Sequence, residues 1–375
     1  MSSSVNKQTQ AHFFHSSNFA DVLSQLGCSV LASTYQAGQL CSFGTHEGKL
    51  QVDLQPYPLA MGIAVGSRRV AVGARGLIWQ LDAVGRSTAS NIEPAGRYEA
   101  ALLPRTAHVS GNIQCHEMAW VDDQLWVVNT LFSCLATIEP GYSFVPRWKP
   151  HFISDCHQPG DRCHLNGMAV DESGPRYVTA LAETDMPNAW RGHKHETGVL
   201  IDVASNEVVS RGFAMPHSPR VYDGRVWVLD SGRGALELVD PSTGRRETVT
   251  VFPGYTRGLS FCGPLALVGL SRIRETSVFG NLPIANQKEE LKCGIGMVDL
   301  RTGKQIASFQ FAGGVEEIFA VEVLPGVRCA AIRAPGTNQG DSDEAEIWVA
   351  PPPSGDLNRL GDSASDQPVM AGRAG

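Results

Sequence analysis

The stretch that decides the fold is residues 115–129, CHEMAWVDDQLWVVN. Two short apolar runs flank the acidic turn Asp122-Asp123, and a histidine stands at the start of the first run. Short apolar runs separated by turn residues predict a pair of antiparallel strands. The same arrangement returns after His164 and after His217. We therefore interpret the whole chain as a ring of copies of this unit.

The copies align at the start of the first strand of each unit. The aligned positions are Met61, His116, Asn166, His217, Arg257 and Glu317, with spacings of 55, 50, 51, 40 and 60 residues. A period near 50 residues with about four short strands per unit predicts an all-β fold, a β-propeller. A pair of β-sandwiches is the alternative, but it would not produce this register. No helix-length amphipathic segment supports a TIM barrel or a doubly wound fold.

We expect six blades from the six aligned copies. Seven is the alternative, because the second-strand pattern appears seven times when residues 30–35 are counted. An open edge would remain unpaired, so the N- and C-terminal strands should close the ring by completing one blade together. The expected organisation is a flexible arm at 1–18, a single propeller domain at 19–350 and a disordered tail at 351–375. Residues 19–26 fit either a short helix or a strand.

Composition limits the classes of partner. The chain has 375 residues, is 42% hydrophobic and has a formal net charge of −7, with no basic run. A nucleic-acid partner is therefore not expected. No apolar run approaches the roughly 20 residues of a membrane span, and the N-terminus lacks an apolar signal core. These features and nine unpatterned cysteines favour a cytoplasmic protein with free thiols and no membrane partner.

The aligned ring supplies the candidate metal ligands. In a propeller, the innermost strands begin around one mouth of the central channel. Imidazole and carboxylate groups that converge there suit a divalent transition metal: Zn, Fe, Cu or Mn. The candidate ligands are His116, His164, His217 and Glu317, with Asn166 as a fifth ligand or as a replacement for His164.

Three long insertions, 183–197, 271–293 and 334–345, are each expected between a second and a third strand, on the face that carries the histidines. Long loops in a compact repeat usually bind ligands. Arginines suit a carboxylate- or phosphate-bearing substrate. The candidate substrate-binding residues are Arg75, Arg233, Arg272 and Arg274, and the candidate catalytic residues are Arg257, His193 and His195.

Several motifs carry resemblances to known families. The stretch 166–171, NGMAVD, resembles the inner-strand motif of gluconolactonase/regucalcin-like and NHL-type propellers. That resemblance implies a divalent metal with carboxylate and amide ligands, which Asn166 and Glu317 match and His116 and His217 do not. Histidine ligation is more similar to peptidyl-amidoglycolate lyase, a six-bladed zinc propeller.

Over residues 19–350 the chain resembles a bacterial conserved-hypothetical family, through the stretches 32–40, 164–169 and 271–275. This resemblance implies a propeller without a settled activity. Two hypotheses follow. One is a metal-dependent enzyme acting on a small anionic or peptide-like substrate, as a lyase, hydrolase or oxygenase. The other is a metal-free propeller that serves as a peptide- or protein-binding platform.

Overall fold

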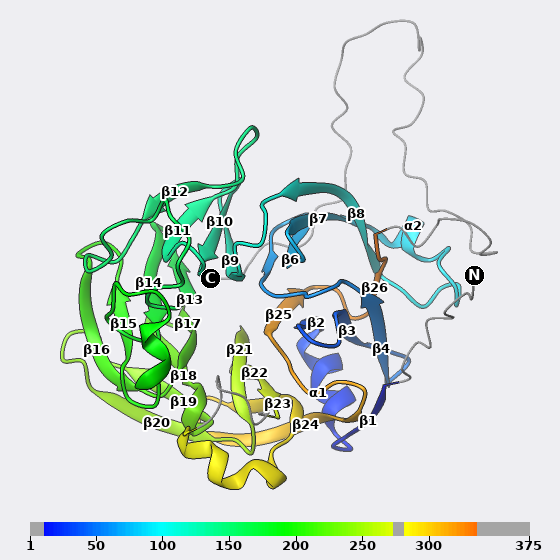
Figure 1. Cartoon of the computed structure of the whole chain (residues 1–375). Coiled ribbons are helices and arrows are strands. Elements are labelled where there is room, and N and C mark those ends of the chain that lie inside the picture. Colours follow the sequence, from blue (N-terminus) through cyan, green and yellow to red (C-terminus); the bar gives the residue numbers. More distant parts are fainter. Residues whose placement is uncertain (1–10, 273–280, 336–375) are drawn as a thin grey trace, which may run out of the picture.

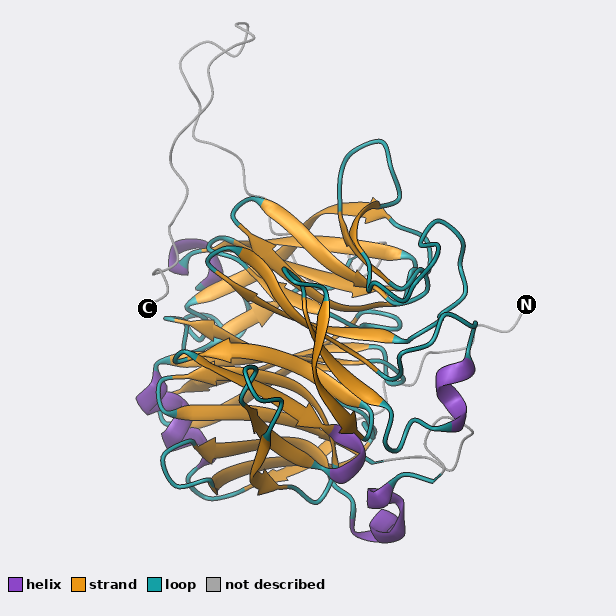
Figure 2. Ribbon diagram, turned by 90° about the vertical axis from the view of Figure 1, so that its left-hand side faces the viewer, coloured by secondary structure: helices purple, strands orange, loops and turns teal. Residues whose placement is uncertain are grey.

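The structure is a computed structural model that describes residues 11–272 and 281–335. Its strands form six sheets around a central axis (Figure 1). Figure 2 shows the strands in the interior and most of the loops at the ends of the blades. The protein is thus a six-bladed β-propeller. The predicted fold class is confirmed, and over the described residues the blade number is six rather than seven.

Five of the blades are built from consecutive strands, innermost strand first. The first is β5 (Ile63–Val65), β6 (Arg69–Ala74), β7 (Leu77–Val84) and β8 (Ala100–Val109). The second is β9 (Cys115–Val121), β10 (Gln124–Asn129), β11 (Cys134–Thr137) and β12 (Val145–Trp148). The third is β13 (Leu165–Asp171), β14 (Gly174–Ala180), β15 (Gly198–Asp202) and β16 (Glu207–Phe213). The fourth is β17 (Pro216–Tyr222), β18 (Arg225–Asp230), β19 (Ala235–Val239) and β20 (Arg246–Val251). The fifth is β21 (Tyr255–Cys262), β22 (Leu265–Ser271), β23 (Cys293–Asp299) and β24 (Lys304–Gly313).

The middle strands of a blade are apolar on both faces because each blade packs between two neighbours. All seven residues of β22, LALVGLS, are buried, and so are all seven of β23, CGIGMVD. The outer strand β20, RETVTV, is half-buried or exposed throughout. Gly269 on β22 allows a close approach to β21 of the same blade, because a Cβ there would lie 2.2 Å from the carbonyl oxygen of Arg257.

The ring closes as expected, through a blade that combines both ends of the chain. Its innermost strand is β25 (Ala320–Pro325), followed outward by β2 (Cys28–Thr34), β3 (Gln39–His46) and β4 (Lys49–Pro56). β25 pairs with β2 in an antiparallel register that runs from Cys28 opposite Pro325 to Ser33 opposite Ala320. In Figure 1 the orange β25 accordingly lies beside the blue β2.

One strand departs from the expected repeat. The insertion 334–345 was expected to follow the second strand of a last copy, but β2 is the second strand of that blade. Instead β26 (Ala330–Ile332) crosses to the neighbouring blade and pairs in parallel with the outer strand β8, Ala330 opposite Ala100. The loop 334–345 therefore does not follow a second strand. Beyond Pro335 it lies outside the described residues, as does the predicted tail.

The N-terminal segment is more ordered than expected. Within the expected arm 1–18, β1 (His12–His15) adds a fifth strand to the edge of β24, with the Phe13 ring 5.1 Å from that of Phe309. The segment that fitted a helix or a strand is the helix α1 (Phe19–Leu26), which ends at Gly27 in the left-handed conformation that favours glycine.

The remaining helices are short connectors: α2 (Arg86–Ala89), η1 (Ala189–Gly192), η2 (Ser231–Arg233) and η3 (Pro283–Glu290). Within the two described ranges, no helix has the length and apolar character required to cross a membrane.

Candidate functional site

The six innermost strands form a closed ring of neighbours, and their starting ends carry most of the predicted site. His116 and His217 are each the second residue of their strands, β9 and β17. His164 directly precedes β13, and Glu317 stands three residues before β25. Arg257 is the third residue of β21. These five residues therefore lie at one mouth of the channel.

His116 and His217 are held by the same local arrangement, two blades apart. In each case Nδ1 lies close to the carbonyl oxygen two residues earlier, 3.0 Å from Gln114 O and 2.9 Å from Met215 O. Gln114 and Met215 both have positive φ, at 53° and 54°, which turns their carbonyls toward the rings. Positive φ in a residue other than glycine is uncommon and costs conformational energy.

A hydroxyl group fourteen residues after each histidine completes the arrangement. Thr130 Oγ1 lies 2.9 Å from Nδ1 of His116, and Ser231 Oγ lies 3.0 Å from Nδ1 of His217. Thr130 donates its own proton to the carbonyl oxygen of Leu165 at 2.5 Å. A carbonyl oxygen can only accept, so Nδ1 of His116 is the donor to Thr130 and to Gln114. Its Nε2 then carries the lone pair.

His164 is fixed by a carboxylate. Its Nδ1 lies 2.9 Å and 3.0 Å from the two oxygens of Asp161, a buried side chain three residues earlier. Among the described residues, no hydrogen bond engages Nε2 of this histidine or of His116 and His217. A histidine that binds a metal usually donates its second ring N–H to a carboxylate or carbonyl in this way.

Burial and positive charge keep two of the imidazoles neutral. Desolvation lowers the pKa of His116 well below its usual value, and His164, Arg257 and His217 lower it further. Desolvation, Arg257 and His164 likewise lower the pKa of His217 well below its usual value. The three histidines and Arg257 thus form one electrostatic unit. Neutral imidazole is the form that binds metal ions.

Arg257 is buried at this mouth. Its guanidinium carbon is 3.3 Å from the ring centre of Phe319, and Nη1 is 3.5 Å from Oε1 of Glu317. The Phe319 ring is also 5.3 Å from that of His116. Phe319 therefore joins the arginine to the histidines, while Glu317 points its carboxylate at Arg257.

The predicted ligands do not form a closed coordination shell. Over residues 11–272 and 281–335, no three His, Cys, Asp or Glu side chains stand close enough together to hold a metal ion. The closest pair is His116 and His164, with ring centres 4.8 Å apart and planes at 84°. Two imidazoles bound through Nε2 at about 2.1 Å to one ion have ring centres roughly 5 Å apart. This pair thus has the separation that shared ligation requires.

Asn166 is engaged differently from a ligand. Its Oδ1 accepts a hydrogen bond from Thr179 Oγ1 at 2.7 Å, and its buried Nδ2 has no partner within the described chain. The oxygen that a metal would need is therefore used inside the blade, and the group left over is a donor.

A buried ion triad spans the channel behind the histidines. Arg220 on β17 donates through Nη1 to Glu117 on β9 and through Nη2 to Glu322 on β25 at 3.0 Å. Glu117 also accepts the backbone N–H of Met168 at 2.7 Å. Burial raises the pKa of Glu117, although Arg220 opposes the shift. Glu117 therefore links blades through Arg220 and Met168.

The three predicted arginines that the structure describes, Arg75, Arg233 and Arg272, share the histidine face but differ in their engagement. Arg75 is exposed in the turn after β6. Arg233 is paired at 2.6 Å with the buried Asp230, and Arg272 follows β22 with its N–H bonded to Glu316 O. Arg274 lies outside the described residues. No contact with the channel histidines is found for His193, which is exposed, or for His195, which pairs with Glu196 at 3.4 Å.

Sequence reasoning missed several residues of this mouth: Asp161, Thr130, Ser231, Phe319, Trp190 and Lys194. A signal existed for Thr130 and Ser231, because each follows its histidine by the same interval of fourteen residues. Asp161 stands three residues before His164, which is also visible in the sequence. Lys194 is buried inside a loop, and no local pattern predicts that.

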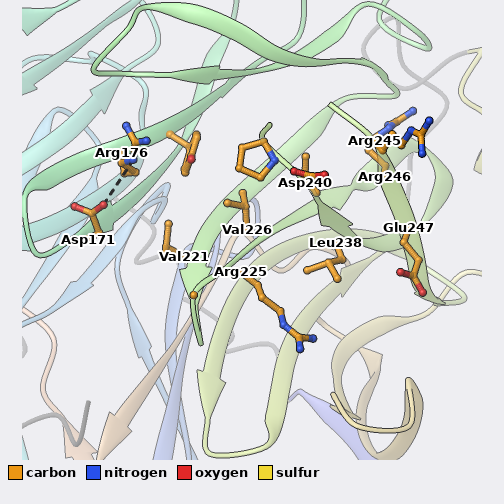
Figure 3. A pocket seen from close by; sticks show the side chains of 14 residues that line it. Asp171, Arg176, Val221, Arg225, Val226, Leu238, Asp240, Arg245, Arg246 and Glu247 are labelled. Carbon is orange, nitrogen blue, oxygen red and sulfur yellow. Dashed lines mark ion pairs between the residues drawn. The ribbon is translucent and has the colours of Figure 1, made fainter. Parts of the chain in front are cut away.

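A cavity of about 610 Å³ opens between the third and fourth blades, at the ends of the strands opposite to the histidines (Figure 3). Asp171, the last residue of β13, and Gly224, in the turn after β17, lie on its wall. Two of its arginines are engaged in the protein. Arg176 pairs with Asp171 at 3.8 Å and with Asp202 at 2.7 Å, and Arg246 pairs with Asp230 at 3.3 Å.

The fold and the mouth define a six-bladed propeller with a histidine- and arginine-lined channel. The chain belongs to the family described as Domain of unknown function (DUF4915), whose model matches residues 17–332. No curated protein matches the sequence.

Among solved structures, the nidogen/laminin complex contains a similar chain, at 10% identity and a TM-score of 0.49, over 80% of this chain and 99% of that one. A protein of unknown function from Bacteroides caccae is similar at 8% identity and a TM-score of 0.49, over 79% and 98%.

Proposed function

We propose that this protein is a metal-dependent enzyme whose ion is held at the channel mouth by His116, His164 and His217. The observation that supports this is the fixed tautomer of the histidines. Each Nδ1 has a carbonyl, hydroxyl or carboxylate oxygen within 3.0 Å, and Nε2 is left as the electron-pair donor. Strained residues at both Gln114 and Met215 are a cost that a merely structural histidine does not require.

Zn, Fe, Cu or Mn fits three imidazoles, and such an ion would polarise a substrate oxygen or activate water or O2. The residues of the chain supply the rest. Arg257, fixed by stacking on Phe319, would orient an anionic substrate beside the histidines. Glu317 would accept a proton or join the ligands when substrate displaces it from Arg257. The ion triad behind the site would restrict solvent access from the channel.

The alternative is a metal-free platform that binds a peptide or protein at the same mouth. It is favoured by the absence, within the described ranges, of three ligands already in contact distance of one ion. In that case the histidine acceptors and Arg257 would hydrogen-bond to the partner.

Metal analysis distinguishes the two. Protein purified without a histidine tag is incubated with Zn, Fe, Mn or Cu, desalted and analysed by mass spectrometry. We expect one ion per chain, lost in His116→Ala and His217→Ala variants that retain the wild-type circular-dichroism spectrum. His157→Ala, which removes an exposed imidazole, is the matched control and should keep the ion. A wild-type protein that retains none of the four metals would overturn the proposal.

A further inference from the structure

A cavity of about 450 Å³ opens next to the histidine pair. His164 and Asp161 form one wall, and Gln114, which fixes His116, lies beside them. Trp190 and Arg191 of the 183–197 insertion also line the cavity. This size is in the range of small-molecule sites. The cavity lies on the same face as the channel mouth, and the inserted loop forms part of its lining.

A continuous stack of side chains joins the cavity to the histidines. The guanidinium carbon of Arg191 is 4.4 Å from the ring centre of Trp190. The Trp190 ring centre is 4.3 Å from that of His164, which is 4.8 Å from that of His116. A group bound against Trp190 would therefore lie within one side chain of the imidazoles.

Arg191 supplies a positive charge on the wall of this cavity. In the described part of the chain no carboxylate pairs with Arg191, whose Nε donates only to the amide oxygen of Asn188 at 3.2 Å. The buried Lys194 donates to the carbonyl oxygen of Arg191 at 3.1 Å. Desolvation lowers the pKa of Lys194, and Arg191 lowers it further. Asp161, the carboxylate of the cavity wall, is already engaged by His164.

Trp190 adds an unused donor. Its side chain is 1% exposed, and its indole N–H has no hydrogen-bond acceptor in the described structure. A buried donor without an acceptor is unfavourable and rare in folded proteins. An oxygen on a bound ligand would satisfy it. The flanking walls are apolar, with Leu131, Pro159 and Pro187.

We infer that this cavity binds a small carboxylate with an apolar or aromatic body, of the size of an acylated amino acid. The carboxylate pairs with Arg191, the body lies against Trp190 and the prolines, and an amide oxygen accepts from the indole N–H. That places the far end of the ligand beside His164. The inference names a substrate class for the proposed enzyme and rests on that proposal for turnover, but not for binding.

Titration calorimetry with chelator-treated protein tests it. The probes are N-benzoylglycine and its neutral isostere N-benzoylglycinamide. We expect the acid to bind at least about tenfold more tightly than the amide, a factor that corresponds to about 1.4 kcal/mol. Arg191→Gln should remove this preference. Arg225→Gln, at an exposed arginine on the wall of the opposite cavity, should leave it intact.

Equal binding of acid and amide, no saturable binding of either, or an unchanged preference in Arg191→Gln would overturn the inference. Trp190→Phe keeps a stacking ring without the indole N–H and should weaken both probes equally. The two proposals fail separately. Acid-selective binding by a protein that retains no metal refutes the enzyme alone, and metal retention without acid selectivity refutes the carboxylate site alone.

Discussion

Replacing Arg220 by methionine tests whether the ion triad holds the ring together. The substitution keeps most of the side-chain volume but removes the partner of two carboxylates on other blades, the buried Glu117 and the partly buried Glu322. Arg220 is 18% exposed, and Glu117 and Glu322 are 9% and 20% exposed. Removing one partner of a buried pair costs about 3–5 kcal/mol, because the remaining charge is left uncompensated. We expect Arg220→Met to lower the free energy of unfolding by that amount at pH 8.

The pH dependence identifies the cause. Without Arg220, only the Met168 N–H and Arg257 oppose the effect of burial on Glu117, so its pKa in the folded state lies further above the usual value. A carboxyl with a raised folded-state pKa destabilises the protein above its ordinary pKa of about 4.3 and ceases to do so as the pH falls toward it. The difference between Arg220→Met and wild type should therefore shrink between pH 8 and pH 5.

The assay is urea denaturation followed by tryptophan fluorescence at several pH values. Arg69→Met is the control, because Arg69 forms an ion pair with an exposed partner, Asp123, at 2.9 Å and should cost no more than about 1 kcal/mol. Adding Glu117→Gln to Arg220→Met should recover part of the loss. A loss below about 1 kcal/mol at pH 8, or one that grows on acidification, would refute the reasoning.

Three further changes have defined outcomes. The folded-state pKa of His217 is lowered, so the unfolded chain binds more protons than the folded protein below about pH 6.5. Thermal melts should therefore show stability falling as the pH drops from 7.5 to 5.5, and His217→Asn should flatten that slope. An unchanged slope would argue against the lowered pKa of His217. Thr130→Val removes an acceptor for Nδ1–H of His116 and should weaken metal retention about 10–100-fold in a chelator competition; equal retention would mean that Thr130 does not orient the ring. Gly269→Ala places a Cβ 2.2 Å from Arg257 O and should lower the free energy of unfolding in urea by about 1–3 kcal/mol. In the control Gly192→Ala, the added Cβ meets nothing within 4 Å, so the free energy of unfolding should fall by less. Equal losses in the two variants would contradict the packing argument.

The propeller could be predicted because the sequence pattern that marks the start of a blade is repeated along the chain. Six starts of an inner strand, five of them polar and the other Met61, precede apolar runs and recur at about fifty-residue intervals. The channel face of His116 and His217 followed from this register alone. Ring closure was also predictable, since an unpaired edge strand is unfavourable.

The errors and omissions concern contacts between distant segments. The apolar run around Ala330 has the pattern of a second strand. It pairs with β8 instead, because β2 is already the second strand of the closing blade. Arg220 reads as an ordinary polar residue after a proline, because the carboxylates that it joins are about a hundred residues away in each direction. The eight described residues 11–18 were expected to lack structure, because His12–His15 is a short strand that depends on β24 for its pairing.

The pairing of β25 with β2 constrains when this protein can fold during synthesis. Cys28 lies opposite Pro325, so the blade that begins with the earliest strands stays without its innermost strand until almost the whole propeller has been translated. Until then β2 exposes an apolar edge, and such edges promote association with other chains. The nascent chain should therefore depend on chaperones until its last strand is made, and proteins truncated before residue 320 should aggregate rather than form a five-bladed ring.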